Sequence, residues 1–308
     1  MTANARPYQQ LDVFSDRPYF GNPLAVVLNA EGLSEEVMQR FARWTNLSET
    51  AFLLPPTKAG ADYRVRIFTP GAELPFAGHP TLGACHAWLD AGGRSRQKDR
   101  VVQECALGLV EIRKTSHLLA FAAPPLRQST PDAAILDKIT RALGLQSEQI
   151  LASRILDNGP VFLGLLLDHP DTVLNLQPDH TALKQHGIKV GVASPYPTKA
   201  APFVIARSSR EARAFADHAD DPPRMAEPDL EVRAFVAPMG VTEDPVTGSL
   251  NASLAQWLIA DGHMPASYVA AQGTCLGREG RVHISSDQPG QVWVGGQVNT
   301  CVKGRVKI

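Results

Sequence analysis

The sequence predicts an α+β protein built from two similar domains that face each other across a cleft. Residues 73–89 and 243–259 form an internal repeat: both begin Glu-x-Pro-x-x-Gly and continue as a helix-like run of small and apolar residues. A strand-like segment precedes each copy, at residues 65–68 and 232–235. The period is half the chain, too long for a solenoid, whose units span about 20–50 residues. Two pseudo-symmetric domains are therefore expected.

Strands and single helices account for most of each half. Residues 11–14 and 24–28 have the composition of paired strands around a turn, which predicts a hairpin-like opening. Ser34 is placed to cap a helix with an acidic first turn. Thr130, followed by a proline, marks the start of another helix, and Gly144 is placed to end it.

The division between the domains is expected after Pro124-Pro125. The N-terminal domain would comprise residues 1–125 and the C-terminal domain residues 130–297. Residues 298–308 follow a glycine pair and have the pattern of a strand that could cross back to complete the first domain. Residues 217–231 are acidic and contain prolines, which indicates a solvated surface loop.

Composition excludes several classes of partner. The 308 residues are enough for two domains with a core each, and the formal net charge of −1 provides no basic field for nucleic acid or an anionic membrane. With no run of eighteen apolar residues and no apolar leader, we expect a cytoplasmic protein. The cysteines show no metal-binding spacing and are expected to be buried, reduced thiols: Cys85, Cys105, Cys275 and Cys301.

Each repeat places a glycine and a polar residue at the start of a helix. Gly78 precedes His79, and Gly248 precedes Ser249, so helices are expected over residues close to 79–91 and 249–261. N–H groups of a first helical turn lack intrahelical partners and carry the positive end of the helix dipole. Two such ends would bind an anion, most simply the carboxylate of a small-molecule substrate. A single glycine could merely allow a tight helix start, but its duplication favours the anion site.

Three ionisable residues are candidates for chemistry. Glu49 lies where a polar stretch enters a strongly apolar strand, a setting in which desolvation raises a carboxyl pKa and suits it to proton transfer. Its alternative role is that of a solvent-facing carboxylate at a strand start. Asp244 lies shortly before the second helix, and His79 can donate or accept a hydrogen bond in the first, although an isolated histidine is more often structural.

At these residues the chain resembles the phenazine-biosynthesis isomerase (PhzF) family. The resemblance is spread from residue 12 to about residue 304, and the combination of motifs is more specific than any one of them. The matching segments are Asp12-Val13-Phe14, Gly21-Asn22-Pro23, Asn46-Leu47-Ser48-Glu49-Thr50, Thr69-Pro70, Glu73-Leu74-Pro75-Phe76-Ala77-Gly78-His79-Pro80-Thr81, Glu243-Asp244-Pro245-Val246-Thr247-Gly248-Ser249 and Gly277-Arg278-Glu279-Gly280.

The resemblance implies a diaminopimelate-epimerase-like fold, in which each domain is a curved, mostly antiparallel sheet around a central helix. It also implies a homodimer that needs no cofactor. Carried over by motif, Glu49 would be the acid/base that moves a proton on a small carboxylate-bearing substrate. His79, Asp244 and Ser249 would position that substrate, and backbone N–H groups at Gly78 and Gly248 would hold its anionic oxygens.

One departure from the wider superfamily argues against a two-thiol epimerase mechanism. Its epimerases and racemases carry a cysteine before each helix-start glycine, whereas this chain has Ala77 and Thr247 there. Neither side chain can take a proton from carbon, so a single-glutamate isomerase is expected rather than a two-thiol epimerase. A non-catalytic small-carboxylate-binding protein on the same fold stays open as the alternative. The sequence does not identify the substrate.

Overall fold

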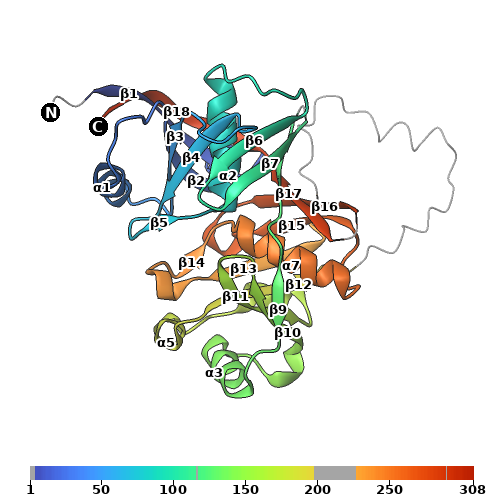
Figure 1. The fold of residues 1–308 in the computed structure, drawn as a ribbon. Helices are drawn as coiled ribbons and strands as arrows, with labels where there is room; N and C mark the ends of the chain where they lie inside the picture. Colours follow the sequence, from blue (N-terminus) through green and yellow to red (C-terminus); the bar gives the residue numbers. More distant parts are fainter. Residues whose placement is uncertain (1–3, 116, 198–226, 289) are drawn as a thin grey trace, which may run out of the picture.

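The computed structural model describes residues 4–115, 117–197, 227–288 and 290–308. Two halves lie one above the other, each with a sheet around one helix (Figure 1). The first and last described strands, Ala5–Val13 and Val298–Lys307, lie side by side at the edge of the upper half. The strands of the described residues form one connected hydrogen-bonded network. This arrangement confirms the α+β class and the two pseudo-symmetric sheet-and-helix units.

The N-terminal half contains eight strands and two helices of the described chain. They are β1 (Ala5–Val13), β2 (Asn22–Val27), α1 (Glu35–Thr45), β3 (Thr50–Leu54), β4 (Tyr63–Phe68), β5 (Glu73–Leu74), α2 (Gly78–Asp90), β6 (Arg100–Cys105), β7 (Gly108–Lys114) and β8 (Leu119–Ala122). β1 pairs antiparallel with β2, β2 runs parallel to β3, and β3 is antiparallel to β4. β4 then pairs with β5 and, in parallel, with β6, which continues into antiparallel β7 and β8.

The C-terminal half follows the same order of pairings. Its elements are β9 (Arg127–Ser129), α3 (Ala133–Leu143), η1 (Ser147–Gln149), β10 (Ile150–Asp157), β11 (Val161–Leu167), α4 (Pro170–Asn175), α5 (His180–His186), β12 (Lys189–Pro195), β13 (Leu230–Phe235), η2 (Ala237–Met239), β14 (Glu243–Asp244), α7 (Gly248–Ala260), β15 (Ser267–Gln272), η3 (Thr274–Leu276), β16 (Gly280–Gln288), β17 (Gln291–Gly296) and β18 (Val298–Lys307). β10 to β17 repeat, strand for strand, the parallel and antiparallel relations of β1 to β8.

The strand that follows the sheet of each half in sequence pairs with the sheet of the other half. β8 of the first half pairs with β17 of the second, and β9, which follows β8, pairs with β10. In the same way β18, which follows β17, pairs antiparallel with β1 along nearly its whole length. The C-terminal strand therefore crosses back to the first sheet, while the exact division at residues 125 and 130 stays a prediction.

The core lies around the two central helices. In β4 the side chains of Tyr63, Val65 and Ile67 point inward and are buried, as the alternation of a half-buried strand requires. Helices α2 and α7 are buried on most of their surface, because the sheets wrap around them. One apolar cluster continues across both halves through Phe121 of β8 and Val294 of β17.

Local expectations were confirmed in part. Ser34 caps α1 by accepting a hydrogen bond from Val37 N, and Gly144 ends α3 in the left-handed conformation at φ 70°. The cap of α3 is Asp132 instead of Thr130, because its carboxylate accepts from two N–H groups of the first turn. The prediction of four buried thiols is wrong for two of them, because Cys275 is exposed and Cys301 is only partly buried.

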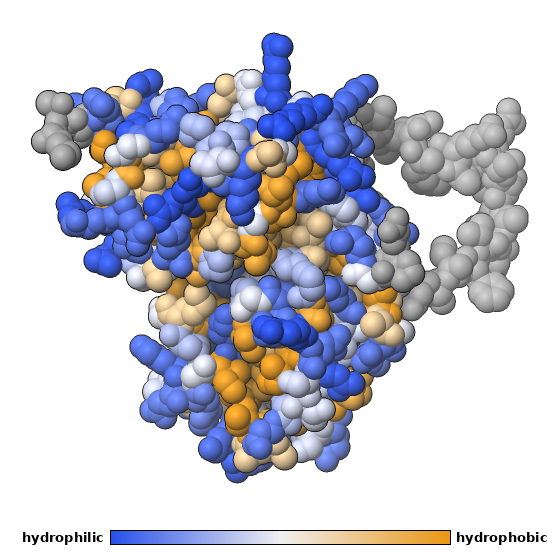
Figure 2. All heavy atoms as spheres, viewed as in Figure 1, coloured by the Kyte–Doolittle hydropathy of each residue, from blue (hydrophilic) through white to orange (hydrophobic). Residues whose placement is uncertain are grey.

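The surface loop expected at residues 217–231 lies largely outside the described residues. Its last two positions, Leu230 and Glu231, instead begin the buried strand β13. In the view of Figure 2, hydrophilic side chains cover the margins of both halves, and apolar ones gather toward the middle of the face. No helix of the described chain is both long and apolar enough to cross a membrane.

Candidate active site

The N-termini of α2 and α7 meet at their first glycines. A Cβ added to Gly78 would lie 2.9 Å from Cα of Gly248, and one added to Gly248 would lie 3.0 Å from Cα of Gly78. The expected pair of buried, facing helix starts is thus confirmed, with each helix beginning one residue earlier than predicted. The first-turn N–H groups, which include those of His79 and Ser249, have no intrahelical acceptors. Two positive helix ends are held in contact here.

A hydrogen-bond network fixes Asp244 ahead of α7. The Thr247 hydroxyl donates to Asp244 Oδ2 over 2.6 Å, and Gln272 Nε2 donates to the backbone oxygen of Asp244 over 3.0 Å. Gln272 Oε1 accepts from Thr247 N at 3.0 Å and from Asn251 Nδ2 at 2.8 Å. Because these partners are buried, the side chain of Asp244 has a defined orientation.

Asn22 joins the two halves at the same place. Its amide nitrogen donates to Asp244 Oδ1 over 3.0 Å and to Val246 O over 2.9 Å, and lies 3.5 Å from His79 Nδ1. Its amide oxygen accepts from the Ser48 hydroxyl at 3.3 Å. Asn22 is fully buried, so one side chain links the residue before Glu49 to both helix starts.

The turn that positions Asn22 requires a glycine before it. Gly21 N donates to Asp12 Oδ2 over 2.8 Å, and a Cβ on Gly21 would lie 2.2 Å from Val13 O. No side chain fits that space. The Gly21-Asn22-Pro23 sequence is therefore explained by close packing on β1 as well as by the site.

Glu49 and His79 lie next to each other without a hydrogen bond. Glu49 Oε2 is 3.5 Å from His79 Nε2, and both atoms are buried with no hydrogen-bond partner among the residues that the structure describes. Burial, followed by the negative charge of Asp244, raises the pKa of Glu49 to about 8, against the opposing hydrogen bond from Ser48. Burial lowers the pKa of His79 to about 3, so its imidazole is neutral at physiological pH.

Asp244 is the anionic member of the group. Burial raises its pKa to about 6, although hydrogen bonds from Thr247 and Asn22 oppose this shift. At pH 7 the site therefore contains a protonated Glu49, a neutral His79 and an ionised Asp244. Two carboxyls whose pKa values are pushed apart in this way are suited to different roles in proton transfer.

Ser249 lies at the first turn of α7, as predicted, and is largely buried. Its backbone oxygen accepts a hydrogen bond from Asn158 Nδ2 over 2.9 Å. All the predicted site residues thus occur on the two helix starts or on the segments that contact them. Among the described residues, no cluster of three or more His, Cys, Asp and Glu side chains is arranged to hold a metal ion.

Sequence reasoning missed the amide side chains of the site. Asn22 stands in a quoted motif but was interpreted only as part of a turn, while Asn158, Asn251 and Gln272 were not considered. Their roles depend on partners distant in sequence, such as Gln272 with Asp244. An Asn-Gly pair at residues 158–159 was the one available signal, and it indicates a turn rather than a site.

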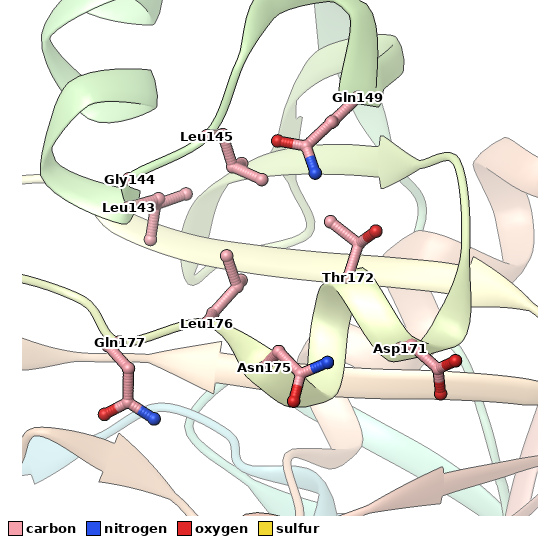
Figure 3. A pocket seen from close by; sticks show the side chains of 9 residues that line it. All are labelled: Leu143, Gly144, Leu145, Gln149, Asp171, Thr172, Asn175, Leu176 and Gln177. Carbon is pink, nitrogen blue, oxygen red and sulfur yellow. The ribbon is translucent and has the colours of Figure 1, made fainter.

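The hollow shown in Figure 3 lies elsewhere, at the distal side of the C-terminal half. It encloses about 400 Å³ between the end of α3 and helix α4. Its lining residues are Leu143, Gly144, Leu145, Gln149, Asp171, Thr172, Asn175, Leu176 and Gln177. Asp171 is mostly exposed, and no buried, unpartnered polar atom belongs to the lining. Its chemistry is that of an ordinary surface groove.

Comparison with known proteins agrees with the geometry at the helix starts. A sequence profile described as phenazine biosynthesis-like protein matches residues 11–304. The chain belongs to the phenazine biosynthesis-like protein family. Antisense-enhancing sequence 1 of Schizosaccharomyces pombe is 33% identical, with 97% of each chain covered. The trans-2,3-dihydro-3-hydroxyanthranilate isomerase of Pseudomonas aeruginosa is 32% identical, covering 92% of this chain and 91% of that one.

Solved structures of phenazine biosynthesis-like proteins share the fold. The PhzF-family phenazine biosynthesis protein of Bacillus anthracis superposes with a TM-score of 0.78 at 20% identity, covering 99% of this chain and 100% of the other. The family match and the isomerase relatives place the protein among the isomerases of the family, and it is an enzyme.

Proposed function

We propose that the protein is a cofactor-independent isomerase that moves a proton between two carbons of a small carboxylate-bearing substrate, with Glu49 as the single acid/base. The observation that carries the proposal is Glu49 itself. Its Oε2 is buried and unpartnered beside the helix starts, and its pKa is raised to about 8. An acid/base poised near the working pH is the most effective proton carrier.

The substrate carboxylate would bind at the two helix ends. Backbone N–H groups around Gly78 and Gly248 are oriented by the contact of α2 with α7 and lack intrahelical acceptors. The neutral imidazole of His79 lies at the same helix start and does not repel a bound anion. This supports the assignment of His79 and Ser249 as residues that position the substrate.

The proton would leave and return on one face. With a pKa of about 8, a fraction of Glu49 is ionised at neutral pH. This ionised form removes a proton from an allylic carbon, the double bond moves by one position, and the same carboxyl returns the proton to the far end of the shifted double bond. Atoms and charge balance without a co-reactant. The Thr247 hydroxyl, which donates to Asp244, and the methyl of Ala77 provide no second base.

The alternative, a protein that only binds small carboxylates, fits the acidic groups less well. Glu49 and Asp244 are both buried at a site for an anion, and the charge of Asp244 raises the pKa of Glu49. Binding alone gains nothing from two carboxyls that repel each other and the ligand. Proton transfer requires at least one of them.

The test is exchange of carbon-bound hydrogen in deuterated water. Unsaturated cyclic amino and hydroxy acids are incubated with the enzyme, beginning with the compound named for the Pseudomonas aeruginosa relative, and deuterium uptake is followed by NMR. Uptake on one face, with a loss of about 10²–10⁴-fold in Glu49→Gln, is expected. Racemisation of the exchanging centre, or equal exchange by Glu49→Gln, would contradict the one-base mechanism.

We also propose a duplicated ancestry for the two halves, a homodimeric state and a cytoplasmic location. The matching strand pairings of the halves support the duplication. The dimer and the location rest on the family resemblance. Light scattering coupled to size-exclusion chromatography measures the oligomeric state directly, and a mass of about 33 kDa would contradict the dimer.

A further inference from the structure

Asn158 contacts the start of α7 from a turn that no motif singled out. It lies between β10 and β11, is only 6% exposed, and donates from Nδ2 to the backbone oxygen of Ser249 over 2.9 Å. Ser249 is one of the residues whose N–H group is proposed to hold the substrate carboxylate. Asn158 therefore contacts the same helical turn whose N–H groups are proposed to hold the carboxylate.

The amide oxygen of Asn158 is buried and has no hydrogen-bond partner within the described residues. Asn22 is a useful comparison, because it also donates to a backbone oxygen at the start of α7, that of Val246. The amide oxygen of Asn22, however, is satisfied by the Ser48 hydroxyl. A buried acceptor left unpaired is destabilising, so such groups in native proteins commonly await a ligand or water.

The turn holds Asn158 in one orientation. Gly159 follows with φ +114°, which a residue with a side chain rarely adopts, and its N–H donates to Asp157 Oδ1 over 3.0 Å. Asp157 is paired with Arg127 of the crossing strand β9 at 2.7 Å. These contacts hold the backbone of the turn, and the hydrogen bond from Nδ2 to the backbone oxygen of Ser249 orients the amide group.

We propose that Asn158 is a specificity-determining residue, whose amide oxygen accepts a hydrogen bond from a hydroxyl or amino group close to the substrate carboxylate. The inference rests on the proposed function, because it needs a carboxylate at the helix starts. It adds a substrate class: acids that carry a hydrogen-bond donor near the carboxylate bind in preference to the same acids without it.

The experiment compares matched ligands by calorimetry. Cyclohexenecarboxylate is titrated beside its monohydroxy and monoamino derivatives at ring positions 2 and 3, into the wild type, Asn158→Ala, Asn158→Asp and the surface control Asn175→Ala. The wild type and the control are expected to prefer at least one substituted acid by about tenfold or more, as loss of a buried hydrogen bond predicts. Asn158→Ala should bind both acids of that pair equally.

The preference ratio separates recognition from a purely structural role, because general loss of the turn weakens both acids alike. Asn158→Asp keeps an acceptor oxygen and should keep the preference, even though it cannot donate to Ser249. If Asn158→Ala does not fold, the affinity ratios of the wild type and of Asn158→Asp for substituted and unsubstituted acids still test the role of Asn158. Equal binding of substituted and unsubstituted acids by the wild type would overturn this role and leave the proposed function intact. Failure of every acid to bind would overturn the carboxylate site and this role together.

Discussion

His79 Nε2 lies 3.5 Å from Glu49 Oε2, and neither atom has a hydrogen-bond partner in the described part of the chain. The two groups do not form an ion pair at neutral pH, because burial keeps the imidazole neutral and the carboxyl protonated. Their unused hydrogen-bonding capacity is therefore available to a substrate. The site holds its acid/base in a state that is costly for the fold and useful for proton transfer.

The first prediction is that Glu49→Gln is more stable than the wild type, by an amount that grows with pH. The folded protein holds a proton on Glu49 up to about pH 8, whereas the unfolded chain loses it near pH 4.5. Wild-type stability relative to the variant therefore falls as pH rises through this window. A difference of several kcal/mol is expected at pH 9, since one pKa unit equals about 1.4 kcal/mol.

Urea unfolding of both proteins at pH 5, 7 and 9 measures this difference. His79 and Asp244 titrate in both proteins, so the comparison isolates Glu49 and its repulsion with Asp244. A gap that stays constant with pH would show that the pKa of Glu49 is not raised by folding.

A second prediction concerns the charge of Asp244. Because that charge raises the pKa of Glu49, Asp244→Asn should move the titration of Glu49 from about pH 8 to lower pH. NMR of ¹³C-labelled glutamate measures the carboxyl directly and needs no substrate. Asp171→Asn, at an exposed position, is the matched control and should leave the midpoint unchanged. An unchanged midpoint in Asp244→Asn would assign the whole shift to burial.

The fold was largely predictable because its signals are local and duplicated. The aligned glutamates Glu73 and Glu243 mark equivalent strands, and both form paired contacts with the arginines Arg66 and Arg233. The exchange of β9 and β18 between the sheets was only partly foreseeable. It depends on pairing between strands that are distant in sequence, and a strand-like composition does not indicate which strand is the partner.

The candidate site was predictable in its ionisable groups and not in its amides. Glu49 was recognisable from the change between polar and apolar residues, and His79 and Asp244 from their place beside the repeats. Asn22 and Gln272 act through partners that are distant in sequence and come together only in the fold. Spacing in the sequence therefore does not predict that these two residues belong to the site. Asp132 replaced Thr130 as a cap because the helix begins two residues later than the proline suggested.

A third prediction is that Gly78→Ala separates the helix starts. The added Cβ would lie 2.8 Å from Phe121 Cζ and 2.9 Å from Gly248 Cα, so backbone must move to admit it. A loss of about 1–3 kcal/mol in unfolding free energy is expected, as for overpacked cores. Gly71→Ala is the control, because its Cβ would approach only Thr69 Oγ1, at 3.8 Å. Equal stability of both variants would contradict the close contact of α2 with α7.

The last prediction is that Asn22→Asp reduces turnover more than Asn22→Ala, although Asp is the closer match in shape. The alanine variant leaves Asp244 Oδ1 and Val246 O without their donor. The aspartate variant also places a second carboxylate against Asp244, which raises the pKa of both groups and further disfavours an anionic substrate. About tenfold lower deuterium exchange is expected for Asn22→Ala, with a larger loss for Asn22→Asp that is partly relieved at low pH. Exchange rates measured from pH 5 to pH 9 distinguish the two variants. If Asn22→Asp were the more active of the two across this range, Asn22 would act by filling space and not by holding Asp244.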